Sequence, residues 1–336
     1  MATLLSPDPT AQATLRVADA IRDQWTRSAV SLIYPNHRDI AAWNAFRGSS
    51  VGLAREFLAT SIADELAAFF TPVGREFLLI ENLPVDPNLP PIPADGMRPA
   101  HKQAVSEAVI TGLISPWAEI FSYVNEKSGV PIHEVTPVPG MEALQSNSGR
   151  TQFGFHSDNA FLPRRFRQQG ILLYGLRNRD VATLVITAEQ IADAAPTALL
   201  NQLSRPAYRH ICPQSFQLGS NERAVSEPRA ILDYDDIGHV RVKAASSRIE
   251  PLDEAARRAL VQFRELLSEI EPVRVVVAPG TALLFKDDRV LHGREAFGGE
   301  RWLQRAYFRE SLDELRSVTR SDSQTISFDA RRLVAA

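Results

Sequence analysis

The feature that most constrains the fold is a change of pattern near residue 132. From there to about residue 309, short apolar segments recur every 8–15 residues, with turn residues such as Gly170, Asp180 and Pro279-Gly280 between them. Strand and helix do not alternate regularly, so the pattern predicts a β-barrel or sandwich and not a parallel βαβ sheet. The expected strands cover 151–156, 170–176, 182–187, 207–213, 229–235, 238–243, 272–278, 281–286 and 302–309.

Helical patterns precede and interrupt these strands. Apolar residues recur at the spacing of amphipathic helices, and Pro116 is expected to break one of the helices. A short apolar run within 75–85 predicts one buried strand, and the prolines of 86–99 predict a loop. The helices are expected at 10–29, 52–70, 100–128, 188–203 and 252–270.

Composition excludes several classes of protein. The net charge is only −3, with acidic and basic residues interspersed, so no broad surface for nucleic acid is expected. Cys212 is the single cysteine, which rules out an intrachain disulfide, a cysteine zinc site and an iron–sulfur cluster. No stretch approaches the roughly 18 apolar residues of a membrane span, and residues 1–8 do not resemble a signal peptide. We therefore expect a cytoplasmic protein without membrane or nucleic-acid partners.

A His-x-Asp pair is the centre of the candidate metal site. His156 and Asp158 lie at the end of an expected strand, and alternate strand residues face the same side, so both side chains can point into a barrel. His292 follows the strand at 281–286 and a short turn, so it can approach the pair from a neighbouring strand. Two imidazoles and one carboxylate hold one face of an Fe(II) ion, which leaves positions for a bidentate co-substrate and dioxygen. The pattern favours a non-heme iron oxygenase.

The His-x-Asp pair alone is a weak signal. Such pairs occur often by chance, and a histidine beside an aspartate is usually a hydrogen-bonded surface pair. The remaining histidines lack comparable neighbours and are expected to be structural or surface residues: His37, His101, His133, His210 and His239.

Two arginines downstream of His292 strengthen the metal-site interpretation. Arg301 directly precedes the expected strand 302–309, and Arg305 lies within it. By strand alternation both arginines share one face with Leu303 and Tyr307. Arginines that point into a barrel are unfavourable unless they meet anions. Because guanidinium groups pair with carboxylates through two parallel hydrogen bonds, they suit a dicarboxylate co-substrate. The alternative is an exposed strand with solvated arginines.

Several ordered segments together resemble the clavaminate synthase-like family of Fe(II)/2-oxoglutarate-dependent oxygenases. This family includes amino-acid hydroxylases and is distantly related to taurine dioxygenase. The resemblance covers about residues 75–310. It rests on Phe77-Leu78-Leu79-Ile80-Glu81-Asn82-Leu83-Pro84-Val85, 137–147, His156-Ser157-Asp158-Asn159-Ala160-Phe161, Leu291-His292-Gly293-Arg294 and Arg301-Trp302-Leu303-Gln304-Arg305.

The resemblance implies the ligands of the cofactors. Fe(II) would bind to His156, Asp158 and His292, and the far carboxylate of 2-oxoglutarate would bind to Arg301 with a hydroxyl from Thr183. An ordinary role for Thr183 as a β-branched strand residue is the alternative. O2 and 2-oxoglutarate would be consumed, succinate and CO2 released, and an unactivated C–H bond hydroxylated.

The implied fold is mainly β with helical additions around a double-stranded β-helix, or jelly roll. One oxygenase domain is expected over 1–336. It would consist of a helical N-terminal portion with one core strand at 1–130, a jelly-roll core with helical insertions at 131–312 and a C-terminal tail at 313–336.

The resemblance also suggests a substrate, namely a free amino acid of secondary metabolism such as antibiotic biosynthesis. Its carboxylate would bind Arg305 and its amino group would lie near Gln145. Asp233, Asp235 and Asp236 lie where arginine and lysine hydroxylases carry acids that bind a basic side chain, which favours arginine or lysine. The alternative is that these acids only form a hairpin turn.

Two departures from the family pattern bear on the substrate pocket. Many close relatives have Glu where this chain has the shorter Asp158, so a substrate pocket of different shape is expected. The segment 162–169 is unusually basic, which fits a solvated loop, a lid or a docking patch for an acidic carrier protein. A free small-molecule substrate is favoured over a carrier-bound one.

Other activities fit parts of the pattern. The same cofactors could serve desaturation, cyclisation or hydroxylation of a non-basic amino acid. Halogenation is disfavoured because Asp158 fills the place where a halogenase leaves room for chloride. A non-catalytic jelly-roll sensor of metal or small acids is a different class, and a metal-dependent hydrolase would give no reason for Arg301 and Arg305.

Overall fold

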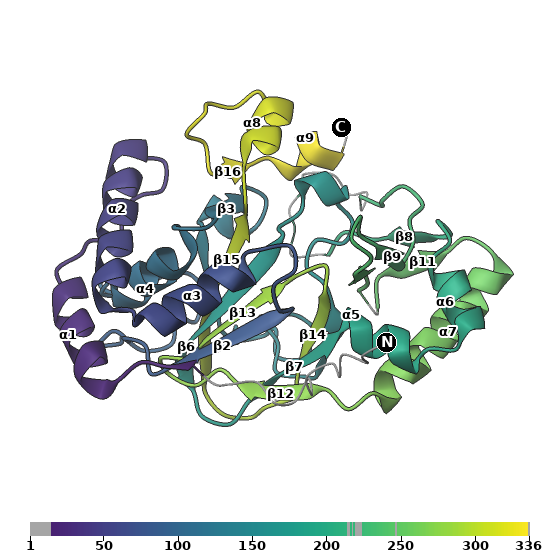
Figure 1. Ribbon diagram of the computed structural model, residues 1–336, viewed down its shortest axis with the longest axis horizontal. Coiled ribbons are helices and arrows are strands. Elements are labelled where there is room, and N and C mark those ends of the chain that lie inside the picture. The colour runs from purple at the N-terminus through teal and green to yellow at the C-terminus, as the bar shows by residue number, and fades with distance from the viewer. Residues whose placement is uncertain (1–14, 214–215, 217, 219–223, 246, 335–336) are drawn as a thin grey trace, which may run out of the picture.

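The computed structural model describes residues 15–213, 216, 218, 224–245 and 247–334. Most of its strands lie in two sheets at the middle of the molecule (Figure 1). The larger sheet has the strand order β1-β2-β13-β6-β15-β3-β16, with β4 paired to β15 beside this path, and the smaller sheet has the order β12-β7-β14-β5. The larger sheet is built from β1 Leu15–Arg16, β2 Phe77–Glu81, β3 Glu119–Tyr123, β4 Ile132–Val135, β6 Gly170–Asn178, β13 Ala282–Lys286, β15 Arg301–Arg309 and β16 Ser327–Phe328. The smaller sheet is built from β5 Phe153–His156, β7 Ala182–Thr187, β12 Val273–Val276 and β14 Val290–Arg294.

Strand β15 occupies the centre of the larger sheet. It pairs antiparallel with β6 on one side and with β3 and β4 on the other. All nine of its residues are buried, so its polar side chains need partners inside the protein. Trp302 and Gln304 donate to the carboxylate of Glu134 on β4, at 2.5 and 2.9 Å.

The two sheets pack against each other and share one hydrophobic core. Val185 of β7 and Val275 of β12 belong to the same buried cluster as Leu173 of β6. Phe285 of β13 contacts His292 of β14 with ring centroids 4.9 Å apart. The space between the sheets is therefore where side chains of both can meet.

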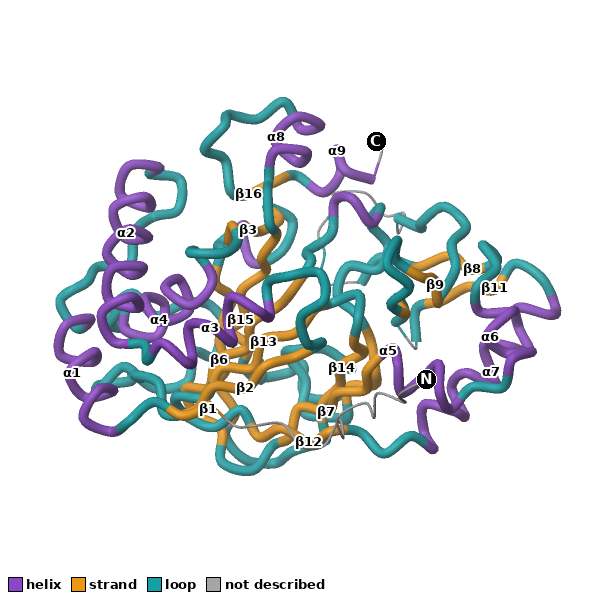
Figure 2. The backbone as a smooth tube through the Cα atoms, in the orientation of Figure 1, coloured by secondary structure: helices purple, strands orange, loops and turns teal. Residues whose placement is uncertain are grey.

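Helices flank the sheets on two sides. Those of the N-terminal half pack beside the larger sheet, and all ten residues of α4 are buried (Figure 2). A second group packs with two short two-stranded sheets, β9 with β10 and β8 with β11, into a separate hydrophobic cluster. The first group is α1 Asp19–Ala29, α2 Ile40–Phe57, α3 Thr60–Phe69 and α4 Val105–Ile114. The second group is α5 Ala188–Ala194, α6 Thr197–Leu203 and α7 Glu254–Glu269, with the strands β8 Tyr208–His210, β9 Leu232–Tyr234, β10 Val240–Val242 and β11 Ile249–Pro251. Two further helices, α8 Asp313–Thr319 and α9 Ala330–Val334, follow β15. Within the part of the chain that is described, no helix combines the length and apolar character needed to cross a bilayer.

Every strand predicted from residue 151 onward is confirmed by a strand within its range, and so is the strand predicted within 75–85. Several helix predictions need correction. Residues 15–16 form a strand that pairs with β2, helix α1 begins only at Asp19, and 10–14 lie outside the described residues. The range 52–70 contains parts of two helices, because Leu58 and Ala59 are extended. Pro196 likewise precedes a separate helix α6 within 188–203.

Strands β3, β4, β11 and β14 lie outside the strand ranges predicted from the sequence. The range 100–128 was expected to be helical, yet β3 forms there after Pro116 and pairs with β15. Pairing with a buried central strand decides the conformation of such a short segment, since local propensity is weak over five residues.

A close backbone contact beside β6 gives a test of this packing. A Cβ at Gly175 would overlap the carbonyl oxygens of Val277 and Ala278. Gly175→Ala is expected to lower the free energy of unfolding by about 1–3 kcal/mol, as measured by urea denaturation. Gly52→Ala is the matched control, because a Cβ on that exposed face of α2 meets nothing within 4 Å and Ala favours the helix by about 0.5–1 kcal/mol. Wild-type stability of the Gly175 variant would contradict the described contact.

Candidate metal centre

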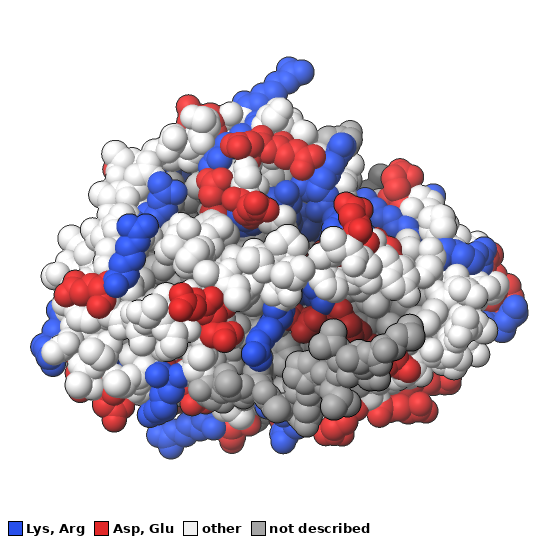
Figure 3. Space-filling view, in the orientation of Figure 1, with Lys and Arg blue, Asp and Glu red and all other residues white. Residues whose placement is uncertain are grey.

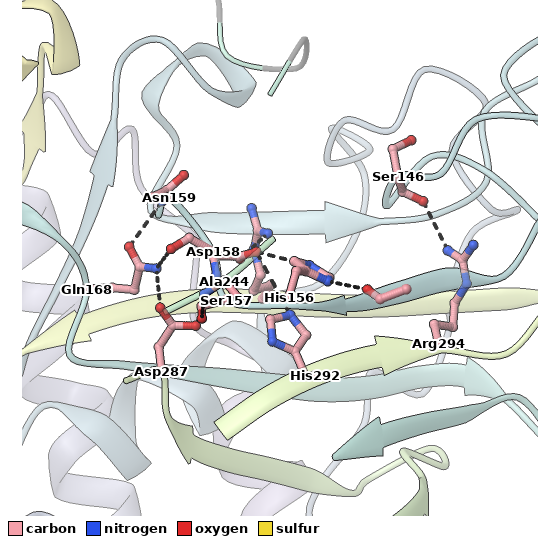
Figure 4. Close-up of polar contacts among 12 residues, drawn as sticks. Ser146, His156, Ser157, Asp158, Asn159, Gln168, Ala244, Asp287, His292 and Arg294 are labelled. Atoms are coloured by element: carbon pink, nitrogen blue, oxygen red, sulfur yellow. Dashed lines mark hydrogen bonds and ion pairs between the residues drawn. The ribbon is translucent and has the colours of Figure 1, made fainter. Parts of the chain in front are cut away.

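Two neighbouring strands of the smaller sheet bring the predicted histidines together. The register pairs His292 of β14 with His156 at the end of β5. Residues that face each other in an antiparallel pair project from the same side of the sheet, and the two imidazole centroids are 4.2 Å apart. Asp158 follows β5 by two residues and turns its carboxylate toward both rings (Figure 4).

The geometry of this triad suits one divalent metal ion. Asp158 Oδ1 lies 3.4 Å from His156 Nε2 and 3.9 Å from His292 Nε2, and all three ligand atoms lie within 4.8 Å of one another. His156 Nδ1 is 2.9 Å from the carbonyl oxygen of Gly154, so a proton on Nδ1 would leave the Nε2 lone pair free to bind metal. Two imidazoles and one carboxylate are the donor set typical of Fe(II) with open coordination positions.

Electrostatics keep the triad in the protonation states that metal binding requires. Burial favours a neutral Asp158, but the Arg305 guanidinium and the two imidazoles outweigh burial and hold its pKa well below the usual range. Burial, together with His156, lowers the pKa of His292 well below its ordinary value. Asp158 is therefore an anion and His292 a neutral imidazole near pH 7.

A buried polar network fixes the backbone of Asp158 (Figure 4). Asp287 Oδ1 accepts a hydrogen bond from the Asp158 amide at 3.1 Å, and Gln168 donates to the Asp158 carbonyl at 2.9 Å and to Asp287 at 2.8 Å. Lys243 forms a short ion pair with Asp287. The sequence analysis missed all three supporting residues, because they come from distant segments and match no local motif.

The triad faces a cavity of about 860 Å³. His156 and Asp158 line its floor, and the segment that contains Gln145 forms part of its wall, with Gln145 exposed. Arg248 also lines this cavity, and among the described residues nothing accepts a hydrogen bond from its buried Nε. Arg248 was not singled out from the sequence, since only the fold brings residue 248 to the metal.

Arg301 and Thr183 are buried donors without acceptors. Arg301 is 4% exposed, its Nε has no partner within the described chain, and burial together with Arg294 lowers its pKa to about 9. The Thr183 hydroxyl also lacks a partner there. Thr183 is paired with Arg294 on β14, two positions from the pair of Val185 with His292, so it shares a face of the sheet with the metal ligand. Orphaned donors of this kind suit a carboxylate.

Arg305 has a different environment from Arg301. Its guanidinium donates to Asp158 Oδ2 at 2.7 Å and to Glu126 Oε1 at 2.6 Å. Tyr307 donates to the same Asp158 oxygen at 2.9 Å. Arg305 thus connects the metal-binding carboxylate to Glu126, a cavity residue that the sequence analysis did not identify.

The three acids expected to bind a basic side chain lie elsewhere. Asp233 forms an ion pair with Arg241 at 2.6 Å across the β9–β10 hairpin. Asp235 accepts from the backbone amides of Ile237 and His239, as the hairpin-turn alternative predicts, and Asp236 is exposed in the same turn. The structure does not bring these residues into the lining of the metal cavity.

Comparisons with known proteins show which proteins this chain is similar to. Residues 73–307 match the family model described as taurine catabolism dioxygenase TauD, TfdA family. L-asparagine oxygenase of Streptomyces coelicolor is 29% identical over 78% of this chain and 80% of its own, and clavaminate synthase 2 of Streptomyces clavuligerus is 26% identical over 82% and 88%. L-ornithine/L-arginine 3-hydroxylase of Catenulispora acidiphila is 24% identical over 58% and 64%.

Solved structures show the same fold at lower sequence identity. Asparagine oxygenase in complex with Fe(II), 2S,3S-3-hydroxyasparagine and succinate superposes with a TM-score of 0.81 and 22% identity, over 94% of this chain and 99% of that one. The resemblance to clavaminate synthase-like oxygenases inferred from the sequence is thereby confirmed.

Removal of one imidazole tests the metal site. His292→Ala removes a metal ligand and should weaken Fe(II) binding by more than about 100-fold. Loss of a residue that only supports a ligand already lowers metal affinity by about 10–100-fold. Anaerobic titration calorimetry with Fe(II) measures the effect. His101→Ala, which alters an exposed histidine, is the control and should bind like wild type. Unchanged Fe(II) affinity in the His292 variant would rule out this triad.

Proposed function

Because the chain belongs to the TauD/TfdA family of iron- and 2-oxoglutarate-dependent dioxygenases, we propose that it hydroxylates an unactivated C–H bond of a free α-amino acid. The observation that carries this proposal is the composition of the cavity. His156 and Asp158 of the His-Asp-His triad line it, and Arg305, which also lines it and donates to Asp158, can bind an acid group.

The proposed roles follow the donors that each residue offers. His156, Asp158 and His292 would hold Fe(II), and Arg301 with the Thr183 hydroxyl would hold the far carboxylate of 2-oxoglutarate, which gives both orphaned donors an acceptor. Bound Fe(II) would activate O2, which is the oxidant: one oxygen atom would enter the substrate C–H bond and the other the succinate formed as 2-oxoglutarate loses CO2. The chain's own part is to position the reacting C–H bond and to keep water from it.

We also propose that the two sheets form a jelly roll within one oxygenase domain. The packing of the smaller sheet on the larger one supports this arrangement. Strands from both ends of the described chain, β1 and β16, join the larger sheet, which favours a single domain over separate halves.

The amino-acid substrate would bind through its carboxylate to Arg305. Glu126 occupies one edge of that guanidinium here, so the substrate carboxylate would compete with Glu126 for the same donors. Gln145 in the cavity wall is the proposed partner of the amino group. The free amino acid is favoured over a carrier-bound one because relatives are named as asparagine and ornithine/arginine hydroxylases.

Two classes of side chain fit different observations. A basic side chain agrees with the ornithine/arginine hydroxylase among the relatives, and Asp95 is an exposed acid in the cavity wall that could bind it. A side chain with an oxygen acceptor, such as an amide or carboxylate, agrees with the unpartnered Nε of Arg248 and with the asparagine oxygenase. Asp233, Asp235 and Asp236 support neither class, because they lie in the hairpin.

The proposed clamp on 2-oxoglutarate predicts a selective defect. Arg301→Ala removes a buried charged donor, which should raise the 2-oxoglutarate concentration needed for half-maximal rate by about 10–100-fold while Fe(II) affinity changes little. Succinate formation measured against each cofactor gives the comparison. Arg274→Ala is the control, since Arg274 pairs with Glu295 on the surface. Equal losses toward iron and 2-oxoglutarate would contradict the role of Arg301.

A panel of amino acids tests the proposed function and the side-chain class. Arginine, lysine, ornithine, asparagine, aspartate and glutamate are supplied with Fe(II), 2-oxoglutarate and O2, and mass spectrometry detects an added oxygen. We expect at least one to be hydroxylated, and Arg248→Ala to weaken an amide or acidic substrate by about tenfold but not a basic one. The proposed function fails if no free amino acid gains oxygen or accelerates succinate formation, which would leave desaturation, cyclisation, a carrier-bound substrate or a sensor.

A further inference from the structure

A second cavity of about 700 Å³ shares no lining residue with the metal cavity. Figure 3 shows Lys and Arg side chains gathered in a hollow on the face turned to the viewer, in the area between α8 and β9 of Figure 1. Only Asp233 and Asp288 are acidic among its lining residues. The basic lining residues are Arg164, Arg165, Arg167, Arg229, Arg241, Lys243 and Arg309.

The acids in and around this cavity account for only part of the positive charge. Arg241 is neutralised by Asp233 at 2.6 Å, and Lys243 by Asp287. Arg229 donates to the carbonyl oxygen of Leu162, which carries no compensating charge. The guanidinium of Arg309 also donates to backbone carbonyls, and its nearest carboxylate, on Glu314, is 4.0 Å away.

Two buried side chains in the cavity wall carry nitrogen atoms that have no hydrogen-bond partner among the described residues. Arg167 is 7% exposed, and no described residue accepts a hydrogen bond from its Nη1. His210 is 1% exposed, and neither of its ring nitrogens has a partner in the described part of the chain. Burial and the neighbouring Arg167 lower the pKa of His210 to about 3, so the ring is neutral and offers one N–H donor. Buried donors are normally satisfied, so this set indicates a missing acceptor.

We propose that this cavity binds a phosphate group. Among the described residues, Arg167 and Arg229 pair with no carboxylate and Arg309 reaches only Glu314, at 4.0 Å; with the His210 N–H they form a donor set suited to a dianion with several oxygens. The volume exceeds that of one phosphate ion, so a phosphate ester of a small metabolite fits better than the free ion. This site is distinct from the proposed chemistry, because none of its lining residues also lines the metal cavity.

The proposed site also adjoins the support of the metal ligand. Lys243 lines this cavity and forms an ion pair with Asp287, which accepts a hydrogen bond from the Asp158 amide. Gln168, another lining residue, donates to the Asp158 carbonyl. A bound phosphate would therefore lie one contact from Asp158 through Gln168 and two through Lys243 and Asp287.

Titration calorimetry tests the proposal on the Fe(II)-loaded protein without oxygen, with 2-oxoglutarate present in excess to occupy Arg301. Inorganic phosphate and glycerol 3-phosphate are the probes, and tighter binding of the ester distinguishes a metabolite site from a site for the free ion. Arg229→Gln keeps a donor for Leu162 but removes the charge, and should weaken the ester by about 10–100-fold. Arg229→Lys should restore part of this affinity, and Arg274→Gln, a surface control, should not change it.

Three outcomes would overturn the proposal. One is the absence of binding heat from either probe at millimolar concentration with wild-type protein. Another is binding that persists in Arg229→Gln but is lost in Arg301→Ala, which would place the anion on the proposed 2-oxoglutarate clamp. Should Arg229→Gln fail to fold, Arg164→Glu reverses a charge on a side chain that is 54% exposed at the rim, and unchanged affinity in that folded variant would also overturn the site.

Discussion

The site depends on how one buried carboxylate is held. Asp158 has one oxygen toward the two imidazoles, while the other accepts from Arg305 and Tyr307. Its backbone is fixed separately through Asp287 and Gln168. The side chain and the main chain of Asp158 are therefore held by different sheets and loops. The position of its carboxylate consequently depends on the assembled fold and not on the segment around residue 158. A carboxylate shorter than glutamate leaves little freedom for this contact to drift.

Orphaned donors distinguish the two arginines that the sequence placed side by side on one strand. Arg301 and Thr183 have no acceptor in the described chain, whereas both Nη atoms of Arg305 donate to carboxylates, of Asp158 and Glu126, and only its Nε lacks a partner there. The first pair suits a cofactor that remains bound through a reaction. The second suits a ligand that must displace an internal carboxylate and can leave again. One strand thereby serves two kinds of binding through the partners that other elements supply.

The sequence predicted those features that local pattern controls. The short strands follow from apolar runs and turn residues, and the triad follows from a His-x-Asp pair, a distant histidine and a family resemblance. Glu126, Lys243, Asp287 and Arg248 could not be predicted, because each reaches the site through tertiary packing alone. The acids of the β9–β10 hairpin show the converse error. The sequence position of these acids matches that of acids in the relatives. In the structure, however, Asp235 accepts a hydrogen bond within the turn and Asp233 forms an ion pair with Arg241.

The position of β15 in the chain has a consequence for synthesis. This strand, Arg301–Arg309, separates β6 from β3 and β4, yet it is made after all of them. Until the ribosome has released it, those three strands have unpaired edges and the larger sheet cannot assemble. Folding of the two-sheet core thus waits for β15, and until then the nascent chain carries exposed strand edges of the kind that promote aggregation.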